Sequence, residues 1–187
     1  MNDVSLPIRV ARLEAESAIR ALKARYAALA DAKYTSDYQR VAPAEMQRLA
    51  LAQAMCFTED AVWAGGSGFG DDLRGRAELV DWFGRSPWCF AVHYYGSPLI
   101  EIDGDAARAD WRLWQLAMRA DTREAVLLAA VTHERYARQH DGAWLCSHMR
   151  FAGLHMTNVG AQGDALAATF AGLDRLRSNP PLTENHA

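Results

Sequence analysis

Two side chains in this sequence are candidates for acid–base chemistry by both their type and their position. The first is His93, in residues 89–95, where β-branched and aromatic residues indicate a strand. Side chains alternate between the faces of a strand, so His93 shares its face with Cys89, Ala91 and Tyr95. A histidine on such a half-buried face needs a hydrogen-bonding partner or water. His93 is therefore either a satisfied core residue or a group available for proton transfer.

Asp31 is the second of these side chains. It continues a stripe of small residues, Ala21, Ala24 and Ala28, at three- and four-residue steps along a predicted helix. A carboxylate on such a face lies either at a solvated helix end or toward a cavity. The sequence alone leaves both interpretations open.

Arg150 lies on the predicted strand 143–155, on one face with Trp144, Cys146 and His148. An arginine on a half-buried strand also needs a partner, and a carboxylate at a sheet edge or on another subunit would provide one. The histidines lack the spacing of metal ligands, so no metal site is predicted.

The elements that must position these residues change in period along the chain. Helices are predicted over residues 8–32, 44–55 and 74–85, and Pro7 and Pro43 stand near the starts of the first two. A short strand is expected over 57–63. Longer strands follow, over residues 89–95, 99–102, 107–118, 125–138 and 143–155. Helices followed by strands joined by tight turns indicate an α+β fold with an antiparallel sheet that curls around the first helix.

Length and composition restrict the class of protein. The chain has 187 residues, of which half are hydrophobic, and a net charge of −3, so we expect one domain without a nucleic-acid role. No membrane span or signal peptide is visible, which predicts a cytoplasmic protein. The three cysteines are widely spaced, and we expect buried thiols rather than a disulfide or zinc site.

Several motifs together resemble the SnoaL-like branch of the nuclear transport factor 2-like superfamily over roughly residues 19–156. In chain order they are Ile19-x-x-Leu22-x-x-x-Tyr26-x-x-x-x-Asp31, Phe57-Thr58-Glu59-Asp60-Ala61-Val62-Trp63, Gly75-Arg76, His93-Tyr94, Ile100-x-Ile102-Asp103-Gly104-Asp105 and Asp141-Gly142-x-Trp144. The resemblance implies a cone-shaped, cystatin-like α+β barrel, in which a curved antiparallel sheet wraps around N-terminal helices and encloses a deep pocket.

A narrower resemblance is to the scytalone dehydratases, the bile-acid 7α-dehydratases and the hexachlorocyclohexane dehydrochlorinases. It implies a catalytic pair of a helix-borne aspartate, here Asp31, and a strand-borne histidine, here His93. It also assigns Tyr26 and Arg150 to the catalytic set, as a hydrogen-bond donor and an anion holder. The implied reaction is a dehydratase-like elimination without a cofactor or metal, with His93 as general base.

The substrate implied by this reading is a small, hydrophobic, cyclic molecule. Aromatic residues suit the wall of its pocket, and the candidates are Trp63, Trp82, Trp88 and Tyr95. Two alternatives stay open: an isomerase or cyclase that uses Asp31 as its base, and a non-catalytic small-molecule-binding module.

Two segments of the chain, an insert and a tail, depart from the family pattern. Residues 34–55 form a long insert that would cap the pocket mouth or pack on a neighbouring subunit. The cone domain is expected over residues 1–159, and residues 160–187 form a C-terminal tail with a weak helix near 164–176. We expect a homo-oligomer, either a dimer or a trimer, because one face of the sheet needs cover.

Overall fold

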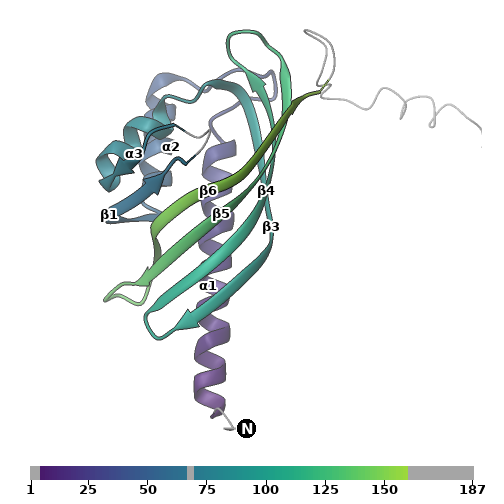
Figure 1. Ribbon diagram of the computed structural model, residues 1–187. Helices are drawn as coiled ribbons and strands as arrows, with labels where there is room; N and C mark the ends of the chain where they lie inside the picture. The colour runs from purple at the N-terminus through teal and green to yellow at the C-terminus, as the bar shows by residue number, and fades with distance from the viewer. Residues whose placement is uncertain (1–4, 67–69, 160–187) are drawn as a thin grey trace, which may run out of the picture.

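Helices come first and long strands follow, as the change in period predicts (Figure 1). The structure is a computed structural model that describes residues 5–66 and 70–159. Its elements are α1 Leu6–Asp31, α2 Pro43–Ala54, β1 Phe57–Ala64, β2 Leu73–Arg74, α3 Gly75–Gly84, β3 Trp88–Asp103, β4 Ala106–Arg119, β5 Ala125–Arg138 and β6 Trp144–Asn158. The elements predicted within the described residues are present, and only the two-residue strand β2 has no counterpart in the prediction.

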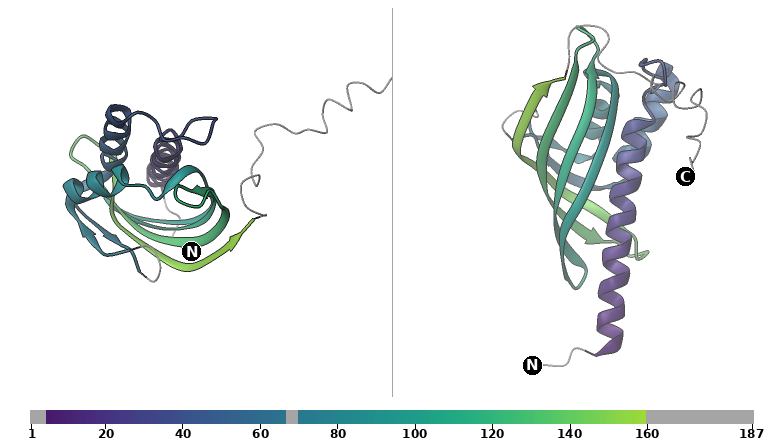
Figure 2. Two further views of the ribbon diagram at one scale, coloured as in Figure 1. Left: turned by 90° about the horizontal axis from the view of Figure 1, so that it is seen from above. Right: turned by 90° about the vertical axis from the view of Figure 1, so that its right-hand side faces the viewer.

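The six strands form one sheet in the order β2-β1-β6-β5-β4-β3. Neighbouring strands are antiparallel except β1 and β6, which run parallel. The sheet curves around α1 without closing, while α2 and α3 lie beside α1 on the same side (Figure 2). The expected α+β fold with a curved sheet around N-terminal helices is therefore confirmed, with one parallel pair in an otherwise antiparallel sheet.

The strands predicted over residues 89–95 and 99–102 form a single strand, β3, that pairs with β4 along its whole length. The pairing register shifts between Gly96 and Leu99, where Ser97 has a positive φ of 45°. This irregularity bends the strand without ending it, because β4 continues on the other side.

Helix α1 buries only part of its length. Its buried side chains include Ile19, Lys23 and Tyr26, which face the sheet. The first turns extend past the strands (Figure 1), and Leu13 in this part of the helix is 66% exposed. Alanines alone are a weak guide to the buried face, since Ala24 is exposed.

The core lies between α1 and the concave face of the sheet. All three cysteines, Cys56, Cys89 and Cys146, are buried free thiols, as the sequence predicts. Within the described residues, no helix is both long enough and apolar enough to cross a membrane. The predicted tail and its helix near 164–176 lie outside the described residues.

Candidate active site

Asp31 and His93 form a hydrogen-bonded pair, although 62 positions separate them in the chain. Oδ1 of Asp31 lies 2.7 Å from Nδ1 of His93 and accepts a second hydrogen bond, 3.1 Å long, from the His93 backbone N–H. Asp31 is the last residue of α1, and its carboxylate reaches the edge strand β3. The side chain of Asp31 is 29% exposed and hydrogen-bonded, so it is not a fully solvated helix end.

A cavity of about 360 Å³ lies beside this pair, between the helices and the concave face of the sheet. Apolar and aromatic side chains make up most of its wall, with a few polar groups among them. The lining residues are Tyr26, Ala30, Lys33, Tyr34, Gln53, Trp63, Gly70, Trp82, Phe83, Arg85, Ser86, Pro87, Trp88, His93, Tyr95, Leu113, Gln115, Arg119, Leu128, Phe151, Leu154 and Met156. This composition is typical of a site for a hydrophobic small molecule.

His93 lines both this cavity and a separate groove formed by α1, β3 and β4, whereas Asp31 lines the groove alone. The aspartate therefore approaches the imidazole from the side away from the cavity. Because Nδ1 donates to Asp31, Nε2 of His93 remains as the nitrogen that can accept a proton. No described residue hydrogen-bonds with that nitrogen.

Tyr26 and Tyr95 line the cavity together with His93. The Tyr95 ring is parallel to the His93 ring, and Tyr26 packs edge-on against Tyr95. Gln53 of α2 is a hydrogen-bond partner of the Tyr26 hydroxyl. Burial raises the pKa of Tyr26 and of Tyr95 well above the ordinary range, so both hydroxyls stay protonated and act as hydrogen-bond donors.

The three tryptophans expected at the pocket wall all line the cavity. Trp63 is buried and packs on Phe151, Trp82 is 37% exposed, and Trp88 is half-buried. Gly70 lies under Trp82, since a Cβ there would stand 3.3 Å from the indole ring.

The structure does not bring Arg150 to this cavity. Arg150 is exposed and pairs across the sheet with His133, which is also exposed. A β-bulge in β6 explains the difference: the register shifts between the pairs of Arg135 and Tyr136, so Ser147 is left without a partner. Counting alternate residues from the strand start therefore gives the wrong face beyond the bulge.

Lys33 and Gln53 are cavity residues that the sequence analysis missed. Lys33 is 4% exposed, and its Nζ donates to Oε1 of Gln53 at 2.5 Å and to the Phe83 carbonyl at 2.8 Å. Burial lowers the pKa of Lys33 to about 7. The expected insert supplies Gln53 through α2, which packs on α1 and α3 and thus helps to enclose the cavity.

Gln115 is a third missed residue, and here the sequence held a usable signal. It is the polar member of an otherwise apolar inward row on β4 that includes Trp111, Leu113 and Ala117. Gln115 is 5% exposed and pairs with His93 in the strand register. No described residue hydrogen-bonds with its side chain, so the amide is available to a ligand.

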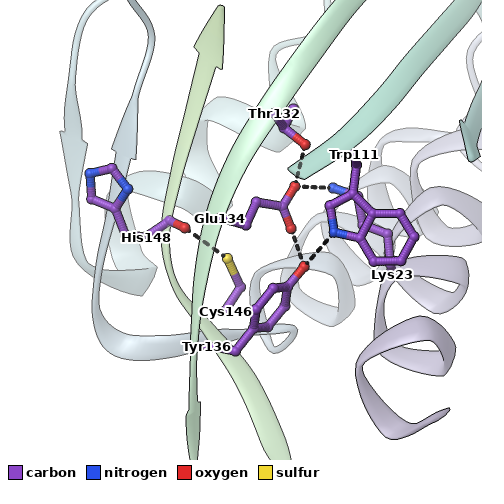
Figure 3. A network of polar contacts seen from close by, with 7 residues as sticks. All are labelled: Lys23, Trp111, Thr132, Glu134, Tyr136, Cys146 and His148. Atoms are coloured by element: carbon purple, nitrogen blue, oxygen red, sulfur yellow. Dashed lines mark hydrogen bonds and ion pairs between the residues drawn. The ribbon is translucent and has the colours of Figure 1, made fainter. Parts of the chain in front are cut away.

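A second polar cluster lies deeper, outside the cavity (Figure 3). Glu134 of β5 accepts hydrogen bonds from Lys23 at 2.5 Å, from Thr132 at 2.5 Å and from the Tyr136 hydroxyl. Trp111 donates to the same hydroxyl at 3.0 Å. Burial lowers the pKa of Lys23 against the opposing effect of Glu134. The pair joins α1 to β5 and has no exposed face, which indicates a structural role.

No group of three or more His, Cys, Asp or Glu side chains in residues 5–66 and 70–159 could hold a metal ion. His133, which the sequence analysis left out of the site, forms an exposed pair with Asp110 at 2.6 Å.

Comparison with known proteins gives a family and a set of related folds. The family model for the SnoaL-like domain matches residues 46–150. A crystal structure of a type 2 hexachlorocyclohexane dehydrochlorinase superposes with a TM-score of 0.68 at 20% identity, over 85% of this chain and 97% of its own. A Novosphingobium aromaticivorans protein provisionally assigned as a scytalone dehydratase gives 0.62 at 15% identity, over 81% and 91%.

A nuclear transport factor 2-like protein with a cystatin-like fold, also from Novosphingobium aromaticivorans, gives a TM-score of 0.58 at 23% identity, over 81% of this chain and 90% of its own. No curated protein matches the chain. At these identities, the likeness to the solved structures shows a shared fold.

Proposed function

The chain belongs to the SnoaL-like domain family, and we propose that it is a cofactor-free lyase that catalyses a dehydratase-like elimination on a small hydrophobic, cyclic substrate. The observation that carries the proposal is the Asp31–His93 pair. It is formed at 2.7 Å, with the imidazole at the wall of a cavity of about 360 Å³. The proteins of similar fold that are named for eliminations agree with this proposal.

In this mechanism, Nε2 of His93 removes a proton from a substrate carbon next to the leaving group. The electron pair of that C–H bond forms the new double bond as the bond to the leaving group breaks. The leaving group departs as halide, or as water once the leaving oxygen has taken the proton back from the His93 imidazolium. Asp31 accepts the hydrogen bond from Nδ1–H, which fixes the tautomer and stabilises the imidazolium that forms. General base catalysis of this kind contributes about 10²–10⁴-fold.

Tyr26 and the Gln115 amide are the groups suited to the leaving oxygen or to a developing enolate. The Tyr26 hydroxyl stays protonated because burial raises its pKa, so it donates a hydrogen bond rather than losing its proton. Gln115 is the cross-strand neighbour of His93, so its amide and the imidazole belong to the same part of the wall.

The alternative in which Asp31 is itself the base has weaker support. Asp31 is not among the cavity-lining residues, and Oδ1 already accepts two hydrogen bonds from His93. A binding module without catalysis would not need the pair, although its cavity would have the same aromatic wall.

The test is a screen of hydroxylated and halogenated cyclic compounds for release of water or halide, followed by variants. We expect His93→Gln and Asp31→Asn each to lower kcat by at least about 100-fold. His133→Gln is the matched control, because it alters a His–Asp pair of the same geometry on the exposed surface. Undiminished turnover in His93→Gln would contradict the proposed base. Turnover by neither the wild type nor any variant would favour the binding module.

A further inference from the structure

The sequence contains only two lysines, Lys23 and Lys33, against 18 arginines, and both lysines are buried. Lys23 has a carboxylate partner, Glu134, at 2.5 Å. Lys33 has none: both of its acceptors, Gln53 and the Phe83 carbonyl, are uncharged. A buried ammonium without a counter-ion is unfavourable, so Lys33 differs from Lys23 in lacking a negative partner.

The charged side chains that line the cavity are cationic. Lys33, Arg85 and Arg119 line it, while none of its described lining residues is an aspartate or glutamate. The two arginines have carboxylate partners outside the lining: Asp81 lies 3.4 Å from Arg85, and Glu124 lies 4.0 Å from Arg119. Lys33 is therefore the cavity cation whose charge no acidic side chain balances.

We infer that the ligand of this cavity is a hydrophobic molecule that carries a carboxylate, and that this carboxylate pairs with the Lys33 ammonium. Protonated, the Lys33 amine has three N–H donors, of which two are used by Gln53 and the Phe83 carbonyl. The third is available to the ligand. The aromatic wall would take the rest of the molecule, with His93 on the same cavity surface.

This inference rests on the proposed function in one respect, since it takes the bound molecule to be the substrate. It names the substrate class as an acid, and it makes Lys33 a specificity-determining residue. A pKa of about 7 means that a bound carboxylate would draw a proton onto Lys33 near neutral pH.

The experiment compares two probes of the same shape, 2-naphthoate and 2-naphthamide, by calorimetry at pH 6.5. We expect the carboxylate to bind the wild-type protein about 10- to 100-fold more tightly than the amide, since a charge-assisted hydrogen bond contributes about 1.5–3 kcal/mol. In Lys33→Met, we expect this preference to fall to less than about threefold while the amide affinity is retained. Arg108→Met, an exposed change on β4 away from the cavity, should leave both affinities unchanged.

Equal affinities for the two probes in the wild type would overturn the inference without any variant, so poor folding of Lys33→Met does not block the test. A preference that survives in a folded Lys33→Met would overturn it as well. Binding is also measured in His93→Gln. A carboxylate preference in this variant, which we expect to lack elimination activity, would support the inference independently of the proposed reaction.

Discussion

At the scale of single residues, the Asp31 carboxylate performs two tasks with one oxygen. Oδ1 accepts the His93 backbone N–H and the ring Nδ1–H, so the same atom holds the strand and orients the imidazole. A hydrogen bond to the backbone limits sliding of β3 against the end of α1, and this keeps the ring at the cavity wall. The geometry thus fixes both the position and the tautomer of the proposed base.

Substitutions of Tyr26 and of Arg150 should have very different effects on kcat. We expect Tyr26→Phe to lower kcat by about 10- to 100-fold, because it removes the hydroxyl at the cavity wall and keeps the buried ring. Arg150→Ala should change kcat by less than about twofold, because Arg150 is exposed and outside the cavity lining. Steady-state kinetics on any substrate found in the screen measures both. A large loss in Arg150→Ala would show that this arginine reaches the reacting atoms.

Lys33 should make the stability of the protein depend on pH. Its pKa is about 7 in the folded chain and 10.5 in the unfolded chain, so the unfolded state binds more protons between these values. The contribution of Lys33 to the free energy of unfolding therefore rises as pH increases through this window, and it is constant below it. Tyr34, Arg85, His93 and Arg119 line the same cavity and are common to wild type and variant.

Lys33→Met removes this contribution and leaves the other groups in place. The free energy of unfolding of the wild type, relative to that of the variant, should thus increase by up to about 3 kcal/mol from pH 7 to pH 9, at about 1.4 kcal/mol per pKa unit. Urea unfolding at several pH values tests this. Parallel curves for the two proteins would mean that Lys33 carries no such shift.

At the scale of elements, period and turn residues predicted most of the fold. The bounds of β5 agree with the predicted strand over 125–138. The inner face of β6 was not predictable beyond Cys146, because the bulge at Ser147 reverses the alternation and has no Gly or Pro to mark it. The register of β3 is regular from Phe90 to Gly96, and there parity placed His93 and Tyr95 on one face, as the structure has them.

The site was predictable where a resemblance fixed the residues and unpredictable where packing fixed them. Asp31 and His93 were identified through family motifs, which record a spatial pairing that spacing alone does not. Lys33 lies in the turn after α1 and Gln53 lies on α2, so the two meet only through the packing of α2 on α1. No local pattern in the sequence distinguishes Lys33 from a solvated lysine at a helix end.

The buried pair of Lys23 and Glu134 joins helix α1 to strand β5 (Figure 3). We expect Glu134→Leu to destabilise the protein by about 3–5 kcal/mol, because it leaves a buried ammonium and the Tyr136 hydroxyl without their acceptor. The double variant Lys23→Met/Glu134→Leu should recover a large part of this loss. Chemical denaturation measures both.

The exposed pair of Glu16 and Arg20, on the same helix, is the matched control. Arg20→Ala should cost less than about 1 kcal/mol, as expected for a solvent-exposed ion pair. If Glu134→Leu were no more destabilising than Arg20→Ala, the buried pair would not be what fixes α1 against the sheet.

At the scale of the whole molecule, the sheet has a concave face filled by helices and an outer face with apolar side chains in solvent. Tyr94 and Trp114 are paired across β3 and β4 and are 62% and 53% exposed. Inward-facing Leu113 and Gln115 flank Trp114 on its strand, so alternation directs the indole outward. Two large aromatic rings side by side on an outer face are typical of a contact surface.

We therefore expect the chain to form dimers or trimers through this face of the sheet, and light scattering after size exclusion should give two or three times the 20.7 kDa mass of one chain. Trp114→Lys should shift the mass toward the single chain, because it puts a charge where apolar surfaces would meet. Leu13→Lys is the control on the projecting turns of α1, where the side chain is 66% exposed. Dissociation by Leu13→Lys instead of Trp114→Lys would move the interface to the helix, and a single-chain mass for the wild type would contradict self-association altogether.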